Sequence, residues 1–361
     1  MLSLYVHIPF CERKCNYCAF NSFVATEEKQ DDYVERLCKE IKRRKSSKPV
    51  QSIYIGGGTP SLLSDKNICK IIKTIFENYD VYEDAEFTIE ANPNSLTEEK
   101  LILYKFLRVN RISLGIQTLD NKNLRKIGRL HNKEMALKKV ELARKYFDNV
   151  SADLIVGLNN EDGRRLCSYA KQLLHLGIKH ISCYLLEVYE DTKLYEMLEK
   201  NLYSILNDDQ TIDAFNKLSN YLIDQGMSRY EISNFAFDGY EGKHNLNYWK
   251  RGEYLGFGIS AHSFIDGKRL KNADTIFDYK SNIVEVENLS TKEVIEEKIM
   301  LGLRCFIGVD LNELKELGYD ITQNEYFFSY LNQGVLTQKE EKIFLNPIYY
   351  HISNTIISNL I

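Results

Sequence analysis

The feature that most constrains the fold of this chain is an alternation of strand-like and helix-like stretches, repeated six times between residues 4 and 200. The apolar strand-like runs are Leu4–Ile8, Ser52–Ile55, Glu86–Ile89, Arg111–Gly115, Val150–Leu154 and His180–Leu185. Amphipathic helical stretches follow them near 28–45, 64–79, 97–107, 134–147, 162–175 and 192–200. A helix between two strands returns the chain to the same edge of the sheet, so this order predicts parallel pairing. Six units exceed half of an eight-unit barrel, which predicts an α/β fold with an open partial (βα)6 barrel; a doubly wound sheet is the alternative.

Chemically distinctive residues follow each of the six strand-like runs. The first run leads to a cysteine-rich segment, and the second leads to the glycines and threonine of 56–60. The remaining four lead, in chain order, to Glu90, Gln117, Asp153 and Glu187. In β/α barrels the loops at the carboxyl ends of the strands form the active site. We therefore expect these residues to meet at one end of the sheet.

Three of the eight cysteines, Cys11, Cys15 and Cys18, are crowded into the segment HIPFCERKCNYCAF with the spacing C-x3-C-x2-C. Thiolates suit iron–sulfur clusters, and three ligands on a [4Fe–4S] cube leave one iron open. A structural zinc site normally takes four protein ligands, and the nearby His7 lies inside the first strand. The pattern therefore favours a three-ligand cluster over zinc. The other cysteines are isolated and are expected to be small apolar residues of the interior: Cys38, Cys69, Cys167, Cys183 and Cys305.

Bulk composition excludes several classes of protein. With 361 residues, 44% of them hydrophobic, the chain suits one large domain with an appendage, or two domains. A net charge of -4 provides no basic field for nucleic-acid binding, so no such partner is expected. No apolar run reaches the ~18 residues that a membrane-spanning helix needs. Since the first ten residues also lack the features of a signal peptide, we expect a cytoplasmic protein.

The pattern of the chain changes after about residue 205. A helix near 208–225 precedes a polar stretch rich in tyrosine and asparagine, 229–249, and a glycine-rich segment, Tyr254–Phe264. From Ser290 onward, short helical patterns, a β-ribbon at Leu336–Leu345 and a last helix predict a small helical or winged-helix-like domain. We therefore divide the chain into a partial barrel (1–205), a barrel extension (206–285) and a C-terminal domain (286–361).

Two further patterns carry weak signals. GFGISA at 256–261 formally fits the dinucleotide fingerprint G-x-G-x-x-G/A, but it lies in no clean strand–helix–strand unit. We interpret it as a packing loop near the open edge of the barrel. Four histidines have no partner at a useful spacing and are expected to be structural or surface residues, namely His131, His175, His180 and His351. His262, beside the glycine loop, is left open.

The cysteine spacing directly after a first strand resembles the signature of the radical S-adenosylmethionine (SAM) superfamily, in which SAM binds the open iron of the cluster. Over nearly the whole chain, the motifs YVHIPFC, YIGGGTPS, IEANP, SLGIQTLD, IGRLHN and ADLIVGL stand in the order typical of one branch of that superfamily. This branch contains oxygen-independent coproporphyrinogen III oxidase and the haem chaperone HemW. The resemblance implies a radical SAM partial barrel that holds a [4Fe–4S] cluster and SAM.

The resemblance also implies roles for individual residues. Tyr5, six residues before the first cysteine, would lie beside SAM. The methionyl amino group of SAM would be contacted by Gly57, Gly58 and Thr59. The ribose and carboxylate contacts would come from Glu90, Gln117, Arg129 and Asp153. Each residue taken singly has a structural alternative, because glycines also form tight turns, Glu90, Gln117 and Asp153 could cap following helices, and Arg129 could be a surface residue.

A second resemblance concerns the segment Tyr230–Gly258, which is similar to the HemW pattern with its H-N-x-x-Y-W core. The core residues here are His244, Asn245, Tyr248 and Trp249. Imidazole is a common iron ligand, and aromatic rings can stack on a macrocycle. The resemblance implies a haem site with His244 on the iron and Tyr248 or Trp249 against the ring. A polar loop that anchors the barrel edge is the alternative.

Three functions are compatible with these observations. The first is a haem chaperone that delivers haem to respiratory haem-protein clients, at the membrane surface, and receives electrons from a reduced flavodoxin- or ferredoxin-like donor. The second is a coproporphyrinogen III oxidase. It is disfavoured because the oxidase has a further cysteine where this chain has Phe20, and an N-terminal extension where only two residues precede Ser3. The third is a zinc-stabilised scaffold. We predict the chaperone, and whether it also turns SAM over stays open.

Overall fold

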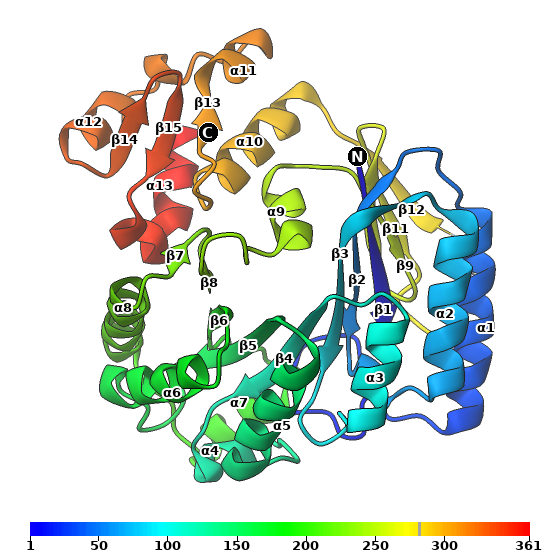
Figure 1. The fold of residues 1–361 in the computed structure, drawn as a ribbon. Helices are drawn as coiled ribbons and strands as arrows, with labels where there is room; N and C mark the ends of the chain where they lie inside the picture. Colours follow the sequence, from blue (N-terminus) through cyan, green and yellow to red (C-terminus); the bar gives the residue numbers. More distant parts are fainter. Residues whose placement is uncertain (281–282) are drawn as a thin grey trace.

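The computed structural model describes residues 1–280 and 283–361, and its centre is a curved sheet of parallel strands (Figure 1). Six adjacent strands run in chain order: β1 (Leu2–Ile8), β2 (Val50–Gly57), β3 (Val81–Ala91), β4 (Arg111–Gln117), β5 (Asn149–Val156) and β6 (His180–Leu185). All six predicted strands are present, although β3 begins five residues earlier than expected, where Val81 pairs with Val50. The parallel order confirms the predicted α/β partial barrel.

Helices follow the strands and cover the convex face of the sheet (Figure 1). They are α1 (Glu27–Arg43), α2 (Asp65–Asn78), α3 (Glu98–Phe106), α5 (Lys133–Tyr146), α6 (Gly163–His175), α7 (Lys193–Glu199) and α8 (Asp208–Asp224). Side chains of Ser64, Thr97, Asn132 and Asp162 accept hydrogen bonds from backbone N–H groups of the first turns and so define where four helices begin. Two short elements are additional to the prediction, η1 (Pro60–Leu62) and α4 (Asn121–Lys126).

The strands are long apolar runs because both faces of the sheet are buried. In β1, Leu2, Leu4, Val6 and Ile8 are fully buried, and so is Ser3, which points the other way. Parallel sheets covered on both faces require this pattern. The apolar strand residues pack with the inner faces of the helices into one large core. This core holds the strand ends in fixed relation to one another.

Residues 206–285 extend the sheet on both sides. On one side, β8 (Asn234–Ala236) pairs antiparallel with β6, and β7 (Ser228–Arg229) pairs antiparallel with β8. On the other side, β9 (Tyr254–Phe257) runs parallel to β1 and continues into β10 (His262–Ile265), β11 (Lys268–Asn272) and β12 (Ile283–Asn288). The helix α9 (Lys243–Trp249) lies between these two groups in the chain. The sequence showed none of these strands, because runs of two to six residues carry too little periodicity.

The segment GFGISA lies beside β1, as its interpretation as a packing loop required. Gly256 belongs to β9, and a Cβ atom there would lie 2.0 Å from the carbonyl oxygen of His262. Gly258 has φ of +99° and donates its N–H to Glu40 of α1 at 2.9 Å. Both glycines therefore serve close backbone packing.

The C-terminal region has a core and a sheet of its own (Figure 1). Its elements are α10 (Thr291–Gly302), β13 (Val309–Asp310), α11 (Leu311–Glu316), η2 (Ile321–Gln323), α12 (Phe327–Asn332), β14 (Leu336–Lys339), β15 (Lys342–Leu345), η3 (Pro347–Ile352) and α13 (Ser353–Leu360). The three strands pair antiparallel in the order β13-β15-β14. This region is the expected small helical domain with a β-ribbon. Within the described ranges, no helix combines the length and apolar character needed to span a bilayer.

Candidate functional site

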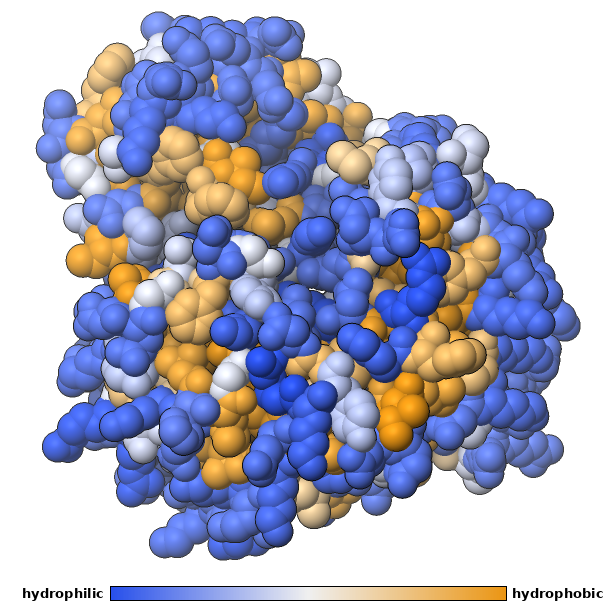
Figure 2. Space-filling model, viewed as in Figure 1, coloured by the Kyte–Doolittle hydropathy of each residue, from blue (hydrophilic) through white to orange (hydrophobic). Residues whose placement is uncertain are grey.

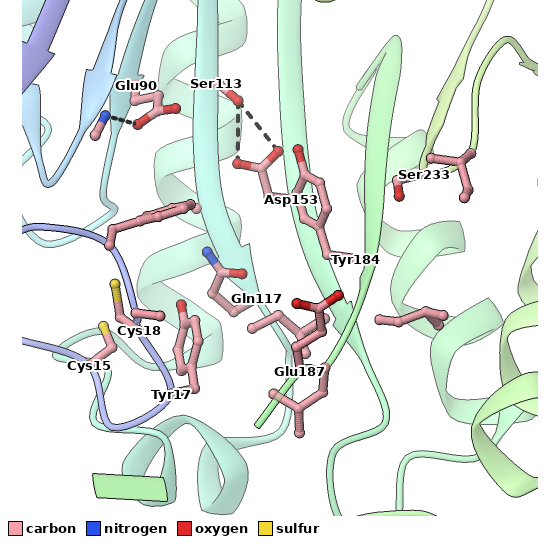
Figure 3. A pocket seen from close by; sticks show the side chains of 18 of the residues that line it. Cys15, Tyr17, Cys18, Glu90, Ser113, Gln117, Asp153, Tyr184, Glu187 and Ser233 are labelled. Atoms are coloured by element: carbon pink, nitrogen blue, oxygen red, sulfur yellow. Dashed lines mark hydrogen bonds between the residues drawn. The ribbon is translucent and has the colours of Figure 1, made fainter. Parts of the chain in front are cut away.

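The carboxyl ends of the parallel strands open into a cavity of about 940 Å³ (Figure 3). Its lining includes most of the residues singled out from the sequence, which are Cys11, Cys15, Cys18, Gly57, Gly58, Thr59, Glu90, Gln117, Arg129, Asp153, Glu187 and Trp249. The expectation that distinctive strand-end residues gather at one end of the sheet is therefore correct. Residues of the C-terminal region complete the opposite wall.

The three cysteines lie on a loop between β1 and α1 that is bonded within itself and to the end of α4. The N–H of Cys11 bonds to the carbonyl of Phe23 at 3.0 Å, while the rings of Phe10 and Phe23 meet edge to face. Asn16, between the cysteines, donates its N–H to the carbonyl of Ile127 at 2.9 Å. Burial raises the pKa of the Cys11 and Cys18 thiols. Hydrogen bonds with neighbouring groups lower the pKa of both thiols and so oppose part of this effect. The loop is anchored on both sides.

The donor set of this loop fits a cluster better than a single ion. In the described residues, no three side chains of His, Cys, Asp or Glu converge on one metal-ion position. A cube needs no such convergence, because each thiolate binds a different iron. His7, the candidate for a fourth zinc ligand, has Nδ1 at 3.0 Å from the Tyr5 hydroxyl and Nε2 at 3.0 Å from the Asn21 carbonyl. The imidazole of His7 is therefore already engaged.

The glycines after β2 pack against the cysteine loop. Gly58 donates its N–H to the carbonyl of Ile8 at 2.7 Å, and Thr59 donates to that of Phe10 at 2.8 Å. A Cβ atom on Gly58 would lie 2.7 Å from the Phe10 oxygen. A side chain at Gly58 would therefore displace the loop that carries the cysteines before it could reach a ligand in the cavity.

Two carboxylates face the cavity from the middle of the sheet (Figure 3). Glu90 accepts hydrogen bonds from the Tyr54 hydroxyl at 2.6 Å and from the N–H of Gly57 at 2.9 Å. Asp153 accepts one from the Ser113 hydroxyl at 3.3 Å. Burial raises the pKa of Glu90 to about 7 and also raises that of Asp153, since both acids are removed from water.

Gln117 lies at the end of β4, and Arg129 joins the cysteine loop to the sheet. Gln117, at the end of β4, has φ of +67°, a conformation that costs energy outside glycine and is concentrated at functional sites. The Nη2 of Arg129 donates to Asn92 at 2.5 Å and to the Gly115 carbonyl at 2.6 Å. Its Nη1 lies 3.5 Å from the Sγ of Cys15. Arg129 is thus bonded into the site and is not the surface residue of the structural alternative.

Tyr5 does not reach the cavity. Its ring is mostly covered, its hydroxyl bonds to His7, and its ring stacks on Tyr54 with centroids 6.2 Å apart. Tyr54, which the sequence did not single out, lines the cavity instead. Tyr5 and Tyr54 are register partners on neighbouring strands and point to the same face of the sheet. The Tyr5 ring packs beside that of Tyr54, and Tyr54 is the one of the two that lines the cavity.

The residues of the H-N-x-x-Y-W core do not all lie at the cavity. Trp249 lines the cavity, whereas His244 is 2% exposed and lies behind Tyr54, with ring centroids 5.2 Å apart. The Nδ1 of His244 lies 2.9 Å from the Ser52 hydroxyl, and its Nε2 lies 2.9 Å from the Tyr248 hydroxyl. Burial lowers the pKa of His244 to about 3.

This burial of His244 has a local cause in α9. Glu86 accepts hydrogen bonds from the N–H groups of Lys243 and His244, both at 2.9 Å, and so holds the first turn of α9 against β3. Neither ring nitrogen of His244 is available for iron, and Tyr248 does not line the cavity. In this structure His244 and Tyr248 therefore do not present the expected iron ligand and ring contact to the cavity, whereas Trp249 lines it.

Several lining residues were given no role by the sequence. Tyr54, Ser113 and Tyr184 come from the sheet itself, and Arg229, Arg304, Tyr350 and His351 come from β7 and the C-terminal region. Tyr54 and Ser113 stand at the first positions of YIGGGTPS and SLGIQTLD, whereas the other five residues stand in none of the quoted motifs. His351 was assigned to the structural or surface histidines. Only the packing of the C-terminal region over the barrel opening brings it to the cavity.

Comparison with known proteins places these observations in context. Residues 5–173 match the family described as the radical SAM superfamily. The chain is 32% identical to the haem chaperone HemW of Lactococcus lactis subsp. lactis (strain IL1403), over 99% of this chain and 97% of that protein. It is 35% identical to the haem chaperone HemW of Bacillus subtilis (strain 168), over 96% of this chain and 95% of that protein.

The fold has a counterpart among solved structures. Coproporphyrinogen III oxidase (HemN) from Escherichia coli, a radical SAM enzyme, superposes with a TM-score of 0.85. The match covers 99% of this chain and 89% of the oxidase, with 21% sequence identity. At that identity the likeness concerns the fold, including the position of the C-terminal region over the barrel.

Proposed function

Because the chain belongs to the radical SAM superfamily and, within it, to the family of the haem chaperone HemW, we propose that it binds a [4Fe–4S] cluster, SAM and haem in one cavity and hands haem to client proteins. The observation that carries the proposal is the convergence of the cysteine loop and the polar strand ends on a cavity that also extends to the C-terminal region. The cavity thus has room beyond the cluster and SAM.

Cys11, Cys15 and Cys18 are the proposed ligands of the cluster. Their loop is bonded to the ends of β2 and α4, so it presents the thiols at the cavity without rearrangement of the sheet. When bound, a cluster with an open iron supplies an electron that can cleave the sulfonium of SAM. The protein contributes the anchored loop, the guanidinium of Arg129 beside Cys15, and a wall that limits the access of water.

The charges of the adjoining wall are suited to SAM. SAM carries a carboxylate, an ammonium, a sulfonium and a ribose with two hydroxyls. Arg129 offers a cation for the carboxylate, while Glu90 and Asp153 offer acceptors for the ribose and the cationic groups. Gln117, Gly57, Gly58 and Thr59 complete the proposed contacts.

Haem is the proposed cargo, and its clients are respiratory haem proteins reached at the membrane surface from the cytoplasm. A reduced flavodoxin- or ferredoxin-like protein is the proposed electron donor. Phe20 supports a chaperone over an oxidase, since it occupies the position of the additional cysteine and lies 67% exposed at the cavity lining. Delivery of a cargo also requires an accessible site, and a cavity beside the open sheet edge provides one.

The experiment compares haem and coproporphyrinogen III side by side. The anaerobically reconstituted protein is titrated with haem, and a second sample receives SAM, a reductant and coproporphyrinogen III. We expect haem binding and no protoporphyrinogen IX. Decarboxylation at ordinary enzyme rates would replace the chaperone with the oxidase. Loss of iron and sulfide with retention of stoichiometric zinc would instead support the zinc-stabilised scaffold.

A further inference from the structure

The cavity has a second wall that is made by β7 and the C-terminal region. This C-terminal wall consists of Arg229, Trp249, Arg304, Tyr350 and His351. Figure 2 shows apolar residues on the side of the C-terminal lobe that faces the hollowed centre of the molecule. The wall therefore combines an apolar surface with two guanidinium groups and an imidazole.

Arg229 is a cation largely removed from water, and the acid that interacts with its charge is the buried Glu231, which lies beyond ion-pair distance. Its guanidinium lies against the ring of Tyr350 at 4.6 Å and that of Phe215 at 4.7 Å, and it donates to the carbonyl of Ile232 at 2.5 Å. Its Nε is buried without a hydrogen-bond acceptor, and in residues 1–280 and 283–361 it forms no ion pair. Burial lowers its pKa to about 10. A charge held away from water in this way is stabilised by an anion that binds beside it.

Arg304 repeats this arrangement at the end of α10. Its guanidinium bonds to the Met300 carbonyl and to the side-chain oxygen of Asn354, and no acid of the described chain lies within ion-pair distance. Burial alone lowers its pKa. The neighbouring acid Glu297 is already paired, with Arg251 at 2.7 Å and with Arg269. Arg304 therefore has an unused charge at the cavity.

Both arginines are tied to the segment that carries His351. Arg229 contacts Tyr350 of η3, and Arg304 bonds to Asn354 at the start of α13. His351 lies between these two contact points, is exposed, and is the histidine that appears among the residues lining the cavity. The buried histidines His7, His131, His180 and His244 each have a ring nitrogen bonded within the protein. Among the residues that the structure describes, no side chain or backbone group forms a hydrogen bond with the His351 ring.

The two walls of the cavity differ in charge. The sheet wall presents the acids Glu90 and Asp153 beside one cation, Arg129, whereas the C-terminal wall presents Arg229 and Arg304 with no acid among its lining residues. A cationic ligand group suits the first wall, and a ligand with carboxylates suits the second. Haem has two propionates on one edge of an apolar ring and an iron atom that accepts imidazole. It matches the C-terminal wall in each of these properties.

We propose that the C-terminal wall is the haem subsite, in which Arg229 and Arg304 bind the propionates, Trp249 and Tyr350 contact the ring and His351 binds the iron. This inference rests on the proposed function and assigns residues to it. It replaces His244, whose nitrogens are engaged in the interior, with a histidine that faces the cavity.

The first test changes the ligand and so leaves the fold untouched. The reconstituted protein is titrated with haem and with haem dimethyl ester, in which both propionates are uncharged. We expect the ester to bind at least roughly tenfold more weakly, since each charged hydrogen bond contributes substantially to affinity. Equal affinity for the two ligands would overturn the inference while leaving haem binding intact. Failure to bind haem at all would overturn the inference and the proposed function together.

The second test changes the protein. Arg304→Gln should weaken haem binding roughly tenfold and leave the affinity for the ester unchanged. Arg164→Gln is the matched control, because Arg164 is 91% exposed on α6 and lies outside the cavity lining. His351→Ala should shift the absorption spectrum of bound iron while iron and sulfide content stay constant. An unchanged spectrum would exclude His351 as ligand, and an unchanged ratio of haem to ester affinity in Arg304→Gln would exclude the arginine.

Discussion

The Nη1 atom of Arg129 lies 3.5 Å from the Sγ of Cys15, although 114 positions separate the two residues in the chain. The same guanidinium donates to Asn92 and to the carbonyl of Gly115. One side chain therefore joins the cysteine loop to the ends of β3 and β4. The hydrogen bonds to Asn92 and Gly115 hold this cation beside the Cys15 sulfur.

This junction predicts a combined defect for Arg129→Gln. Binding of SAM should weaken by roughly 1–3 kcal/mol, because a charged hydrogen-bond donor is lost. The cluster should also be lost faster in the presence of a chelator, because Cys15 loses its neighbouring cation. Equilibrium SAM binding and the rate of iron release measure the two effects. Arg125→Gln, an exposed arginine of α4, should behave like the unaltered protein in both assays.

The cysteines should divide into two groups. Replacement of any one of Cys11, Cys15 or Cys18 by alanine should abolish the [4Fe–4S] absorption after reconstitution, because a cube held by three thiolates has no spare protein ligand. Iron content should stay near that of the parent protein when alanine replaces an isolated cysteine, these being Cys38, Cys69, Cys167, Cys183 and Cys305. If the Cys183 variant lost the cluster and the Cys18 variant kept it, the assignment of the ligands would be wrong.

Gly58→Val should lose the cluster as well as SAM. Its Cβ would lie 2.7 Å from the carbonyl oxygen of Phe10 and 2.8 Å from that of Ile8, so the loop carrying the cysteines must move. Iron content after reconstitution measures the effect. Gly239→Ala is the control: alanine is strained at its φ of +81°, but no atom lies within 4 Å of a Cβ there, so this variant should keep its iron. A Gly58→Val protein with full iron and no SAM affinity would restore the ligand-contact explanation.

The stability of the protein without its cofactors should fall as the pH rises. The pKa of Glu90 is raised to about 7 in the folded protein, so the folded state holds a proton that the unfolded chain releases near pH 4.5. The contribution is complete below that value and is lost as the pH passes through about 7. Asp153, Glu161 and Glu231 act in the same direction.

Glu90→Gln tests this pH dependence. The variant should unfold with a smaller decrease in melting temperature between pH 5 and pH 8, corresponding to a difference on the order of 2 kcal/mol. Thermal unfolding at a series of pH values provides the measurement. If the parent protein became more stable over this interval and the variant did not change the slope, the raised pKa of Glu90 would be contradicted.

His244→Ala should destabilise the fold without altering the haem spectrum. The substitution removes the buried partners of Ser52 and Tyr248, which should cost about 2–4 kcal/mol in the free energy of unfolding. Denaturant unfolding gives the first quantity, and absorption of the haem complex gives the second. If the variant had a changed haem spectrum and an unchanged free energy of unfolding, His244 would be the iron ligand instead of His351.

The sequence predicts those parts of the structure that depend on residues close together in the chain better than those that depend on distant residues. The six strands of the partial barrel were placed correctly, because a strand buried on both faces is a continuous apolar run. The short strands β7 to β12 and the helix α9 were missed, because they pack with the sheet through contacts far apart in the chain. Arg129 lay in a recognisable motif, but its position beside Cys15 followed only from the folded structure.

Two histidines, His244 and His351, show the difference between what the sequence predicts and what the tertiary structure decides. His244 stands in a motif and His351 stands in none, yet His351 lines the cavity and His244 is bonded to Ser52 and Tyr248 in the interior. The amino-acid sequence by itself determined the cysteine loop and the order of the strands, because ligand spacing and hydrophobic periodicity are local properties of the chain. Only the tertiary structure decided which side chains face the cavity, because that depends on how α9 and the C-terminal region pack against the barrel.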